Sequence, residues 1–214
     1  MIRVGPEIEP LVELLCRRYP TARHSTVVEL LRLGGVRHPA AANRRVRELV
    51  DAGLLSRHHA LVRPLLRLEK PLYAARGPFD YGRAEALAWQ LEKRWTRDPL
   101  ERARVYTPTA RLLGVFGGVV KPRVGKYAQL SHDLQCAQLF THYLRTDPAF
   151  ARTLVSEHGQ SGPKSAKDPR PDFLAVDSAG RAHLALDVGG VYDARRLRRL
   201  FADCERRGLA LELW

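Results

Sequence analysis

Three acidic residues in the last third of the chain could together do chemistry: Glu157, Asp172 and Asp187. Carboxylate oxygens are hard ligands of the kind that Mg²⁺ prefers. Metal-assisted hydrolysis of a phosphodiester needs clustered carboxylates to hold the metal, and a further group to orient or activate the attacking water. Such chemistry therefore depends on elements that bring the three acids together and on a residue that supplies the further group.

The elements that would position these acids follow one another over the last 85 residues or so, from about residue 130 to 214. Asp193 is a natural N-cap for a helix that Gly208 ends, and a turn at 178–181 makes a hairpin of the two strands around it. Period-two alternation places Ala185, Asp187 and Gly189 on one face of their strand. Hydrophobic periodicity predicts the following order: a helix over 131–145, strands over 151–158, 171–177 and 182–189, a helix over 193–207 and a strand over 209–214.

This αβββαβ order, with Pro171-Asp172 opening the second strand and Asp187 on the third, resembles the PD-(D/E)XK, or restriction-endonuclease-like, superfamily. The resemblance implies that Asp172 and Asp187 hold a divalent metal. Glu157 could be a third acidic ligand, because hard oxygen ligands suit Mg²⁺, or a solvated carboxylate at the end of its strand. The resemblance also implies a lysine two positions after the second acid, which helps to activate the attacking water. Gly189 occupies that position here.

A cation from elsewhere in the chain could replace the missing lysine. The candidates are Lys164, Lys167, Arg195 and Arg196. An arginine is a poor substitute for a proton-accepting lysine because it stays protonated. The sequence therefore predicts a non-catalytic core that serves structure, homodimerisation or DNA contact. No cofactor is required in that case, and Mg²⁺ would bind only to an active site.

Positive charge is concentrated in the first part of this chain of 214 residues, whose net charge is +13. Residues 1–76 hold 14 Lys and Arg against 7 Asp and Glu, residues 77–127 hold 10 against 5, and residues 128–214 hold 12 against 11. A polyanion is the natural partner of such a basic half. A general bias toward arginine on solvated faces would not localise the excess in this way.

Three predicted helices and a hairpin occupy the first 76 residues. The helices cover 8–19 and 25–33, a third opens at His38-Pro39 and ends at Gly53, and the hairpin joins 54–57 to 62–73. This order resembles a winged helix–turn–helix, which implies that the third helix enters the major groove of double-stranded DNA. The alternative is a three-helix protein-interaction domain with a solvated arginine face. The residues expected at DNA are Asn43, Arg44, Arg45 and Arg47 from the helix, and Arg57 and Arg63 from the tip of the hairpin.

The predicted fold class is mixed α/β, with three consecutive parts. Residues 1–76 form the winged helix–turn–helix and residues 128–214 form the restriction-endonuclease-like αβββαβ core. Residues 77–127 form a helical connector, with helices over 81–97 and 107–116.

Short motifs in several of these elements resemble the replication-relaxation family of bacterial plasmids and other mobile elements. They are Leu130 to Leu134 (Leu-Ser-His-Asp-Leu), Ser156-Glu157 and Pro171-Asp172, together with the winged-helix start. The resemblance implies a DNA-associated role in plasmid replication, DNA relaxation or transcriptional control, and does not by itself imply cleavage. His132 and Asp133 match the helix motif and could line a site, while Asp133 could instead stabilise the first helical turn.

The sequence as a whole predicts a cytoplasmic protein that binds double-stranded DNA. No apolar run approaches the ~20 residues that span a bilayer, and the first residues show no secretory signal segment. The three cysteines, Cys16, Cys136 and Cys204, are widely spaced, and each lies in a predicted helix among apolar neighbours, which is typical of buried thiols in a reducing compartment. Two other functions remain open: a Mg²⁺-dependent deoxyribonuclease with a rearranged active site, and a protein-interaction module of a mobile-element or defence system.

Overall fold

A computed structural model of the chain describes residues 5–118, 127–160 and 170–214. The fold contains α-helices and two β-sheets, so the predicted mixed α/β class is confirmed. Two compact units divide the chain: Met1–Leu65 with Leu100–Pro148, and Leu66–Pro99 with Ala149–Trp214. Each unit is therefore built from two separate stretches, which differs from the three consecutive parts expected from the sequence.

The first unit begins with three groups of helical turns, as the hydrophobic periodicity predicts. Pro39 occupies the first turn of the third helix, where its missing N–H costs nothing. Gly53, with a φ of +67°, then turns the chain into a strand. The elements are η1 (Pro6–Ile8), α1 (Glu9–Val12), η2 (Glu13–Arg18), β1 (Ala22–Arg23), α2 (His24–Leu33), α3 (Pro39–Asp51), β2 (Leu55–Val62), β4 (Glu101–Pro108), α5 (Ala110–Phe116) and α6 (Tyr127–Thr146).

The sheet of the first unit has the strand order β1-β4-β2, and both pairings are antiparallel. β2 pairs with β4 along its whole length, from Leu55 opposite Pro108 to Val62 opposite Glu101. The predicted hairpin between 54–57 and 62–73 is therefore wrong. Val62 still belongs to β2, and the chain passes through residues 66–99 of the second unit before the partner strand begins. The helix predicted from 107 begins only after the Thr109 cap, because residues 107 and 108 complete β4.

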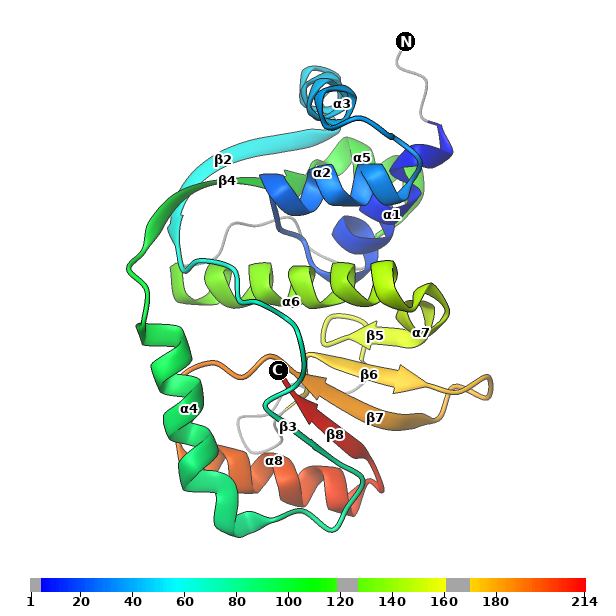
Figure 1. Cartoon of the computed structure of the whole chain (residues 1–214). Helices are drawn as coiled ribbons and strands as arrows, with labels where there is room; N and C mark the ends of the chain where they lie inside the picture. The colour runs from blue at the N-terminus through cyan, green and yellow to red at the C-terminus, as the bar shows by residue number, and fades with distance from the viewer. Residues whose placement is uncertain (1–4, 119–126, 161–169) are drawn as a thin grey trace. The chain divides into compact units, whose positions relative to one another are not determined.

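One face of this sheet is covered by α6 (Figure 1), and the other is exposed toward the end where Val62 pairs with Glu101. Val62 and Val105 pack with Leu130 and Leu134 of α6, and the partly buried Ala60, Leu65 and Ala103 join them. Successive side chains of a strand point to opposite faces, so the residues that alternate with Ala60 and Val62 on β2, and with Ala103 and Val105 on β4, face outward. The exposed ones are Arg57, His59 and Leu61 on β2 and Arg102 and Arg104 on β4.

The second unit is a five-stranded sheet with the order β3-β8-β7-β6-β5. β5, β6 and β7 form an antiparallel meander, and the chain then crosses through α8 to β8, which is parallel to β7. β3 adds an antiparallel edge next to β8. The elements are β3 (Tyr73–Ala75), η3 (Tyr81–Arg83), α4 (Ala84–Thr96), α7 (Pro148–Thr153), β5 (Leu154–Ser156), β6 (Phe173–Val176), β7 (Ala182–Asp187), α8 (Ala194–Arg206) and β8 (Ala210–Leu213).

Helices α4 and α8 supply most of the core of the second unit. Leu87 and Leu91 of α4 pack with Leu197, Phe201 and other side chains of α8 and with residues of β6, β7 and β8. Asp193 caps α8 as predicted, accepting a hydrogen bond from the Arg196 backbone N–H.

Two predictions for this part of the chain need correction. The strand expected over 151–158 shrinks to Leu154–Ser156, because residues 148–153 continue as helix α7. The helix expected over 131–145 forms as α6, but it belongs to the first unit rather than to the αβββαβ core.

Candidate functional site

Helix α3 exposes two of the four side chains that the sequence predicts to contact DNA. The Arg44 side chain is 72% exposed and its Nε lies 3.6 Å from a Glu48 carboxylate oxygen. Arg47 is also exposed, and in the described part of the chain it forms no ion pair. Both guanidinium groups are therefore accessible to a partner.

The other two predicted residues of α3 are engaged inside the first unit. Arg45 is only 14% exposed, and its guanidinium binds Glu7 at 2.8 Å and Glu48 at 3.0 Å. Asn43 donates from its amide nitrogen to the Pro39 carbonyl, 2.9 Å away, and its amide oxygen lies 2.7 Å from a ring nitrogen of His24. These contacts fix α3 against its neighbours.

His24 links Asn43 to the sheet. Its other ring nitrogen lies 3.2 Å from the Tyr106 hydroxyl on β4, and the two rings pack at a centroid distance of 5.7 Å. Arg57 is directly opposite Tyr106 in the strand register. His24 therefore joins α3 to β4, one of the two strands that carry the outer face of the sheet.

That outer face carries more positive charge than the sequence alone suggested. Arg57 is exposed, as expected. His59 stands opposite Arg104 and Leu61 stands opposite Arg102, and all four are exposed. Arg102 and Arg104 escaped prediction because their segment was interpreted as a connector. The alternation of arginine with Ala103 and Val105 is the period-two signal that would have found this strand.

Arg63 has a main-chain role at the end of β2. Its backbone N–H donates to the Ser131 hydroxyl at 3.0 Å, and its carbonyl accepts from Arg23 at 2.9 Å. Gln135 of α6 donates to the next carbonyl, that of Pro64, at 2.8 Å. Two polar side chains of α6 thus hold the main chain where it leaves the sheet.

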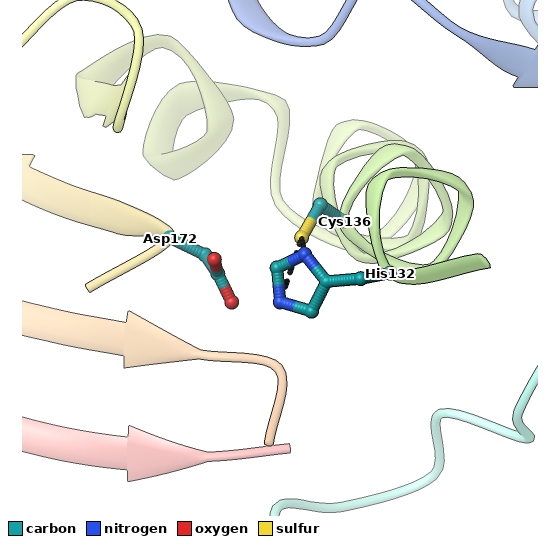
Figure 2. A group of neighbouring side chains, drawn as sticks. All are labelled: His132, Cys136 and Asp172. Atoms are coloured by element: carbon teal, nitrogen blue, oxygen red, sulfur yellow. Dashed lines mark hydrogen bonds between the residues drawn. The ribbon is translucent and has the colours of Figure 1, made fainter. Parts of the chain in front are cut away.

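The helix motif around residues 130–134 makes contacts along α6 itself. Asp133 is buried and accepts from the Gln129 side chain at 2.7 Å. His132 lies beside Cys136, with its ring nitrogens 3.7 and 3.9 Å from the sulfur atom (Figure 2). The contact from Gln129 gives Asp133 a structural role in the first turns of α6.

The acidic residues of the second unit lie at corresponding positions of three adjacent strands. Asp172, drawn in Figure 2, directly precedes β6, and Phe173 pairs with Leu186, so Asp172 comes level with Asp187 at the end of β7. On the other side the Glu157 backbone N–H donates to the Asp172 carbonyl at 2.9 Å. The strand register therefore aligns the three acids.

Their side chains do not form a metal cage. The carboxylates of Glu157, Asp172 and Asp187 do not make a group whose ligand atoms all lie within 4.8 Å of one another. Asp172 and Asp187 are both buried, and one oxygen of Asp172 accepts from the Val188 backbone N–H at 2.7 Å. One oxygen of Asp172 thus holds the main chain after β7, and we derive no metal-dependent step from this arrangement.

Gly189, at the position where the superfamily has a lysine, is packed closely against a side chain of helix α4. A Cβ added to Gly189 would lie 2.5 Å from a methyl group of Leu91 on α4. The Gly189 backbone N–H donates to the Trp214 carbonyl at 3.1 Å, and its own carbonyl accepts from the Trp95 indole. The glycine is therefore required by close packing against α4.

None of the cations proposed as replacements is placed beside the acids by the described contacts. Lys164 and Lys167 lie outside the described residues, and Arg195 and Arg196 are exposed in the first turn of α8.

Asp177 is a turn residue, since one of its oxygens accepts hydrogen bonds from the Ala179 and Arg181 backbone N–H groups at 2.9 Å. The hydrogen bond from Arg181 lowers the pKa of Asp177.

Comparisons with known proteins leave the family of the chain undetermined, because no family model, curated protein or solved structure matches it. Among the described helices, none is long and apolar enough to cross a membrane.

Proposed function

We propose that the first unit is a winged helix–turn–helix that binds double-stranded DNA, with α3 in the major groove. The element order supports this: a helical start, a short strand, two helices and two long antiparallel strands, with β1 adding to the edge of β4. In this proposal β2 and β4 form the wing. The wing has no short tip, because the chain between its strands runs through the second unit.

The observation that carries the proposal is a set of exposed basic side chains on α3 and the strands, which we call the α3–wing surface. It is formed by Arg44 and Arg47 on α3 and by Arg57, His59, Arg102 and Arg104 on the strands. Phosphate contacts from such side chains supply affinity, while contacts from a helix to base edges supply specificity. Asn43 and Arg45 orient α3 from behind this surface.

The ion pairs of the first unit mostly involve arginines outside the α3–wing surface, so most of the positive charge on that surface is not neutralised. The unit holds 18 Lys and Arg against 9 Asp and Glu, a net charge of +9. In its described residues, Arg47, Arg57, Arg102 and Arg104 pair with no carboxylate. A surface rich in unneutralised arginine favours a polyanion. Five glutamates instead pair mainly with other arginines, as Glu7 with Arg45, Glu13 with Arg17 and Arg18, Glu29 with Arg145, Glu48 with Arg45 and Arg44, and Glu101 with Arg23.

DNA-binding measurements with two pairs of substitutions test this assignment. We expect Arg44→Ala/Arg47→Ala to weaken duplex binding and to flatten the dependence of log affinity on log salt by about 0.9 for each phosphate that is no longer bound. Arg17→Ala/Arg145→Ala removes the same charge from exposed positions of the same unit and should leave the slope unchanged. Equal effects of the two pairs would contradict the α3–wing surface as the binding site.

For the second unit we propose a restriction-endonuclease-like core that does not cleave DNA. The meander β5-β6-β7, the crossover through α8 and the parallel β8 support the resemblance, as does the alignment of Glu157, Asp172 and Asp187. The close packing of Leu91 against Gly189, which stands at the lysine position, and the use of Asp172 by the main chain argue against catalysis. The role then suggested by the replication-relaxation resemblance is plasmid replication, relaxation or transcriptional control.

The alternative for this unit is a Mg²⁺-dependent deoxyribonuclease with a rearranged site, favoured by the same three aligned acids. Incubation of the purified protein with supercoiled plasmid and Mg²⁺ or Mn²⁺ separates the two. We expect no nicking and no linear product, and we expect Asp172→Asn to bind DNA as the wild type does. Metal-dependent cleavage that disappears in Asp172→Asn would establish the nuclease instead.

A further inference from the structure

Helix α8 of the second unit carries an arginine-rich outer face. Its buried side consists of Leu197, Leu200, Phe201 and Cys204 with Asp203 at its margin. Spacing of four and seven residues along a helix returns to the same face. Arg195, Arg199 and Arg206 are exposed and follow that spacing along the side opposite the core.

Several arginines of α8 are neutralised by neighbouring acids. Arg198 pairs with Glu85 of α4, and Arg206 and Arg207 both pair with Asp203. These ion pairs neutralise the arginines at the C-terminal end of α8 and the arginine on the side of α8 next to α4.

Within the described residues, three arginines in the first half of α8 have no such carboxylate partner. Arg195 and Arg199 are exposed, and in the described part of the chain neither forms an ion pair. The Arg196 guanidinium lies over the Tyr192 ring, 3.8 Å from its centroid, which holds it flat without neutralising it. These three residues are the α8 arginine cluster.

This cluster does not serve the stability of the helix. Arg195 and Arg196 lie in the first turn, where cations oppose the helix dipole. Arg195 and Arg199 are separated by four residues, and like charges at that spacing repel each other. An anionic partner would relieve both effects, so a binding role explains the cluster better than a folding role.

We propose that the α8 arginine cluster binds the phosphate backbone of nucleic acid, as a second contact surface in addition to α3 and the wing. Guanidinium groups bind phosphate oxygens in a bidentate manner, and the helical rise separates Arg195 from Arg199 by about 6 Å. A lipid surface fits less well, because a helix that lies in a membrane interface inserts an apolar face. The apolar face of α8 is instead buried in its own core.

The inference rests on the proposed function for its setting, because a tethered second surface adds most when the first has already bound. Only residues 97–100 separate α4 of the second unit from β4 of the wing. A short tether makes the second binding event intramolecular and raises the overall affinity without further contacts in the first unit.

The test measures duplex binding by the full chain as a function of salt. We expect Arg195→Ala/Arg199→Ala to lower the log–log slope by about 1.8, that is about 0.9 for each of two phosphates. Its deficit in affinity relative to the wild type should therefore shrink about tenfold between about 50 and 200 mM salt. Arg152→Ala/Arg181→Ala is the matched control, since both arginines are exposed elsewhere in the same unit, and it should keep the wild-type slope.

A second pair of variants separates charge from structure. Arg195→Lys/Arg199→Lys keeps both charges and should retain most of the salt slope. Because the cluster does not stabilise α8, the thermal midpoint of Arg195→Ala/Arg199→Ala should not fall below that of the wild type. Identical slopes for the alanine pair and the control pair would overturn the proposal. So would binding of anionic phospholipid vesicles that is lost in the alanine pair while DNA binding is kept.

The two proposals fail in different ways. A loss of slope in Arg195→Ala/Arg199→Ala with none in Arg44→Ala/Arg47→Ala would uphold the α8 arginine cluster and contradict the α3–wing surface. The opposite pattern would contradict the cluster alone.

Discussion

At Gly189 the main chain of the second unit passes close to Leu91, a side chain that is fully buried. The glycine does not have a left-handed φ, so its requirement is one of space. A side chain here would have to displace the Leu91 side chain, which is part of the core. The sequence identified Gly189 as the position of a missing lysine, but it could not show that α4 fills the space, because α4 lies about 100 residues away in the chain.

Replacement of Gly189 should therefore destabilise the protein rather than restore activity. We expect Gly189→Ala to lower the free energy of unfolding by about 1–3 kcal/mol through overpacking, and Gly189→Lys to lower it further. Leu91→Ala alone should cost about 2–5 kcal/mol. Denaturant titration of the two alanine variants and of the double variant measures whether they are coupled.

In the Leu91→Ala background the added methyl group has room, so Gly189→Ala should cost less there than in the wild type. Contacting residues typically show coupling of about 0.5–3 kcal/mol. Strictly additive costs would mean that Leu91 does not exclude a side chain at position 189.

The cysteines are all free and buried, which confirms the prediction of buried thiols. Burial raises the pKa of Cys16 to about 11 and that of Cys204 to about 12, from an ordinary value of 9.0. The folded protein then retains protons that the unfolded chain releases. The corresponding stability is complete below pH 9 and is lost as the pH rises toward 11–12.

We therefore expect the free energy of unfolding to fall with pH above 9, and to fall less steeply in Cys204→Ala than in the wild type. Denaturant titrations at several pH values between 9 and about 11 give these slopes. The comparison uses the slopes because the alanine variant also loses packing at every pH. Parallel slopes would show that Cys204 ionises equally easily in both states.

Among the elements, α6 shows how a helix predicted correctly can be given the wrong neighbours. Its periodicity predicts a helix over 131–145, and the helix in the structure, Tyr127–Thr146, contains that range and begins four residues earlier. Its place in an αβββαβ core came from the resemblance, whereas Leu130 and Leu134 pack against Val62 and Val105 of the first unit. Ser131 and Gln135, which a helical pattern alone would treat as polar surface, are buried and bind the main chain after β2.

Loss of the Ser131 hydroxyl should accordingly cost stability. Ser131→Ala leaves the Arg63 backbone N–H without its acceptor, which we expect to lower the free energy of unfolding by about 1–3 kcal/mol. Thr146→Ala is the matched control, because the Thr146 hydroxyl donates to the His142 carbonyl at an exposed position of the same helix. Its effect should stay within about 0.5 kcal/mol. If chemical denaturation gave equal losses of stability for the two variants, the hydrogen bond from the Arg63 backbone to Ser131 would not contribute to stability.

For strands, the sequence predicted best what is local. The β6–β7 hairpin, with its turn held by Asp177, and the strand after Gly208 both form as expected. β4 and β3 escaped prediction because neither pairs with a strand next to it in the chain. β4 pairs with β2 across 38 intervening residues, and β3 pairs with β8 at the other end of the sequence. The same difference applies to the candidate site. The sequence predicted Arg57 on β2 as a site residue, but it did not predict Arg102 and Arg104 on β4.

At the scale of the whole molecule, the chain crosses between its two units three times, near residues 65, 99 and 148. Hydrophobic periodicity is a local signal, so it gives the elements of each unit but not the order in which the chain visits the units. The structure therefore predicts a boundary for the first unit that differs from residue 76. A shortened chain can test it.

A chain of residues 1–148 in which residues 66–99 are replaced by a short turn such as Asn-Gly should fold as the first unit. Val62 and Glu101 already face each other at the end of β2 and β4, so a tight connection joins strands that are in register. Residues 1–76 alone should not fold, because β2 would lose β4 and the α6 side chains that cover it. Far-UV circular dichroism and cooperative thermal unfolding distinguish the two chains.

The spliced chain should also bind duplex DNA, with a salt slope no steeper than that of Arg195→Ala/Arg199→Ala, because it keeps α3 and the wing and lacks α8. Cooperative folding of residues 1–76, or a slope for the spliced chain equal to that of the wild type, would contradict this division of the molecule and of its DNA contacts.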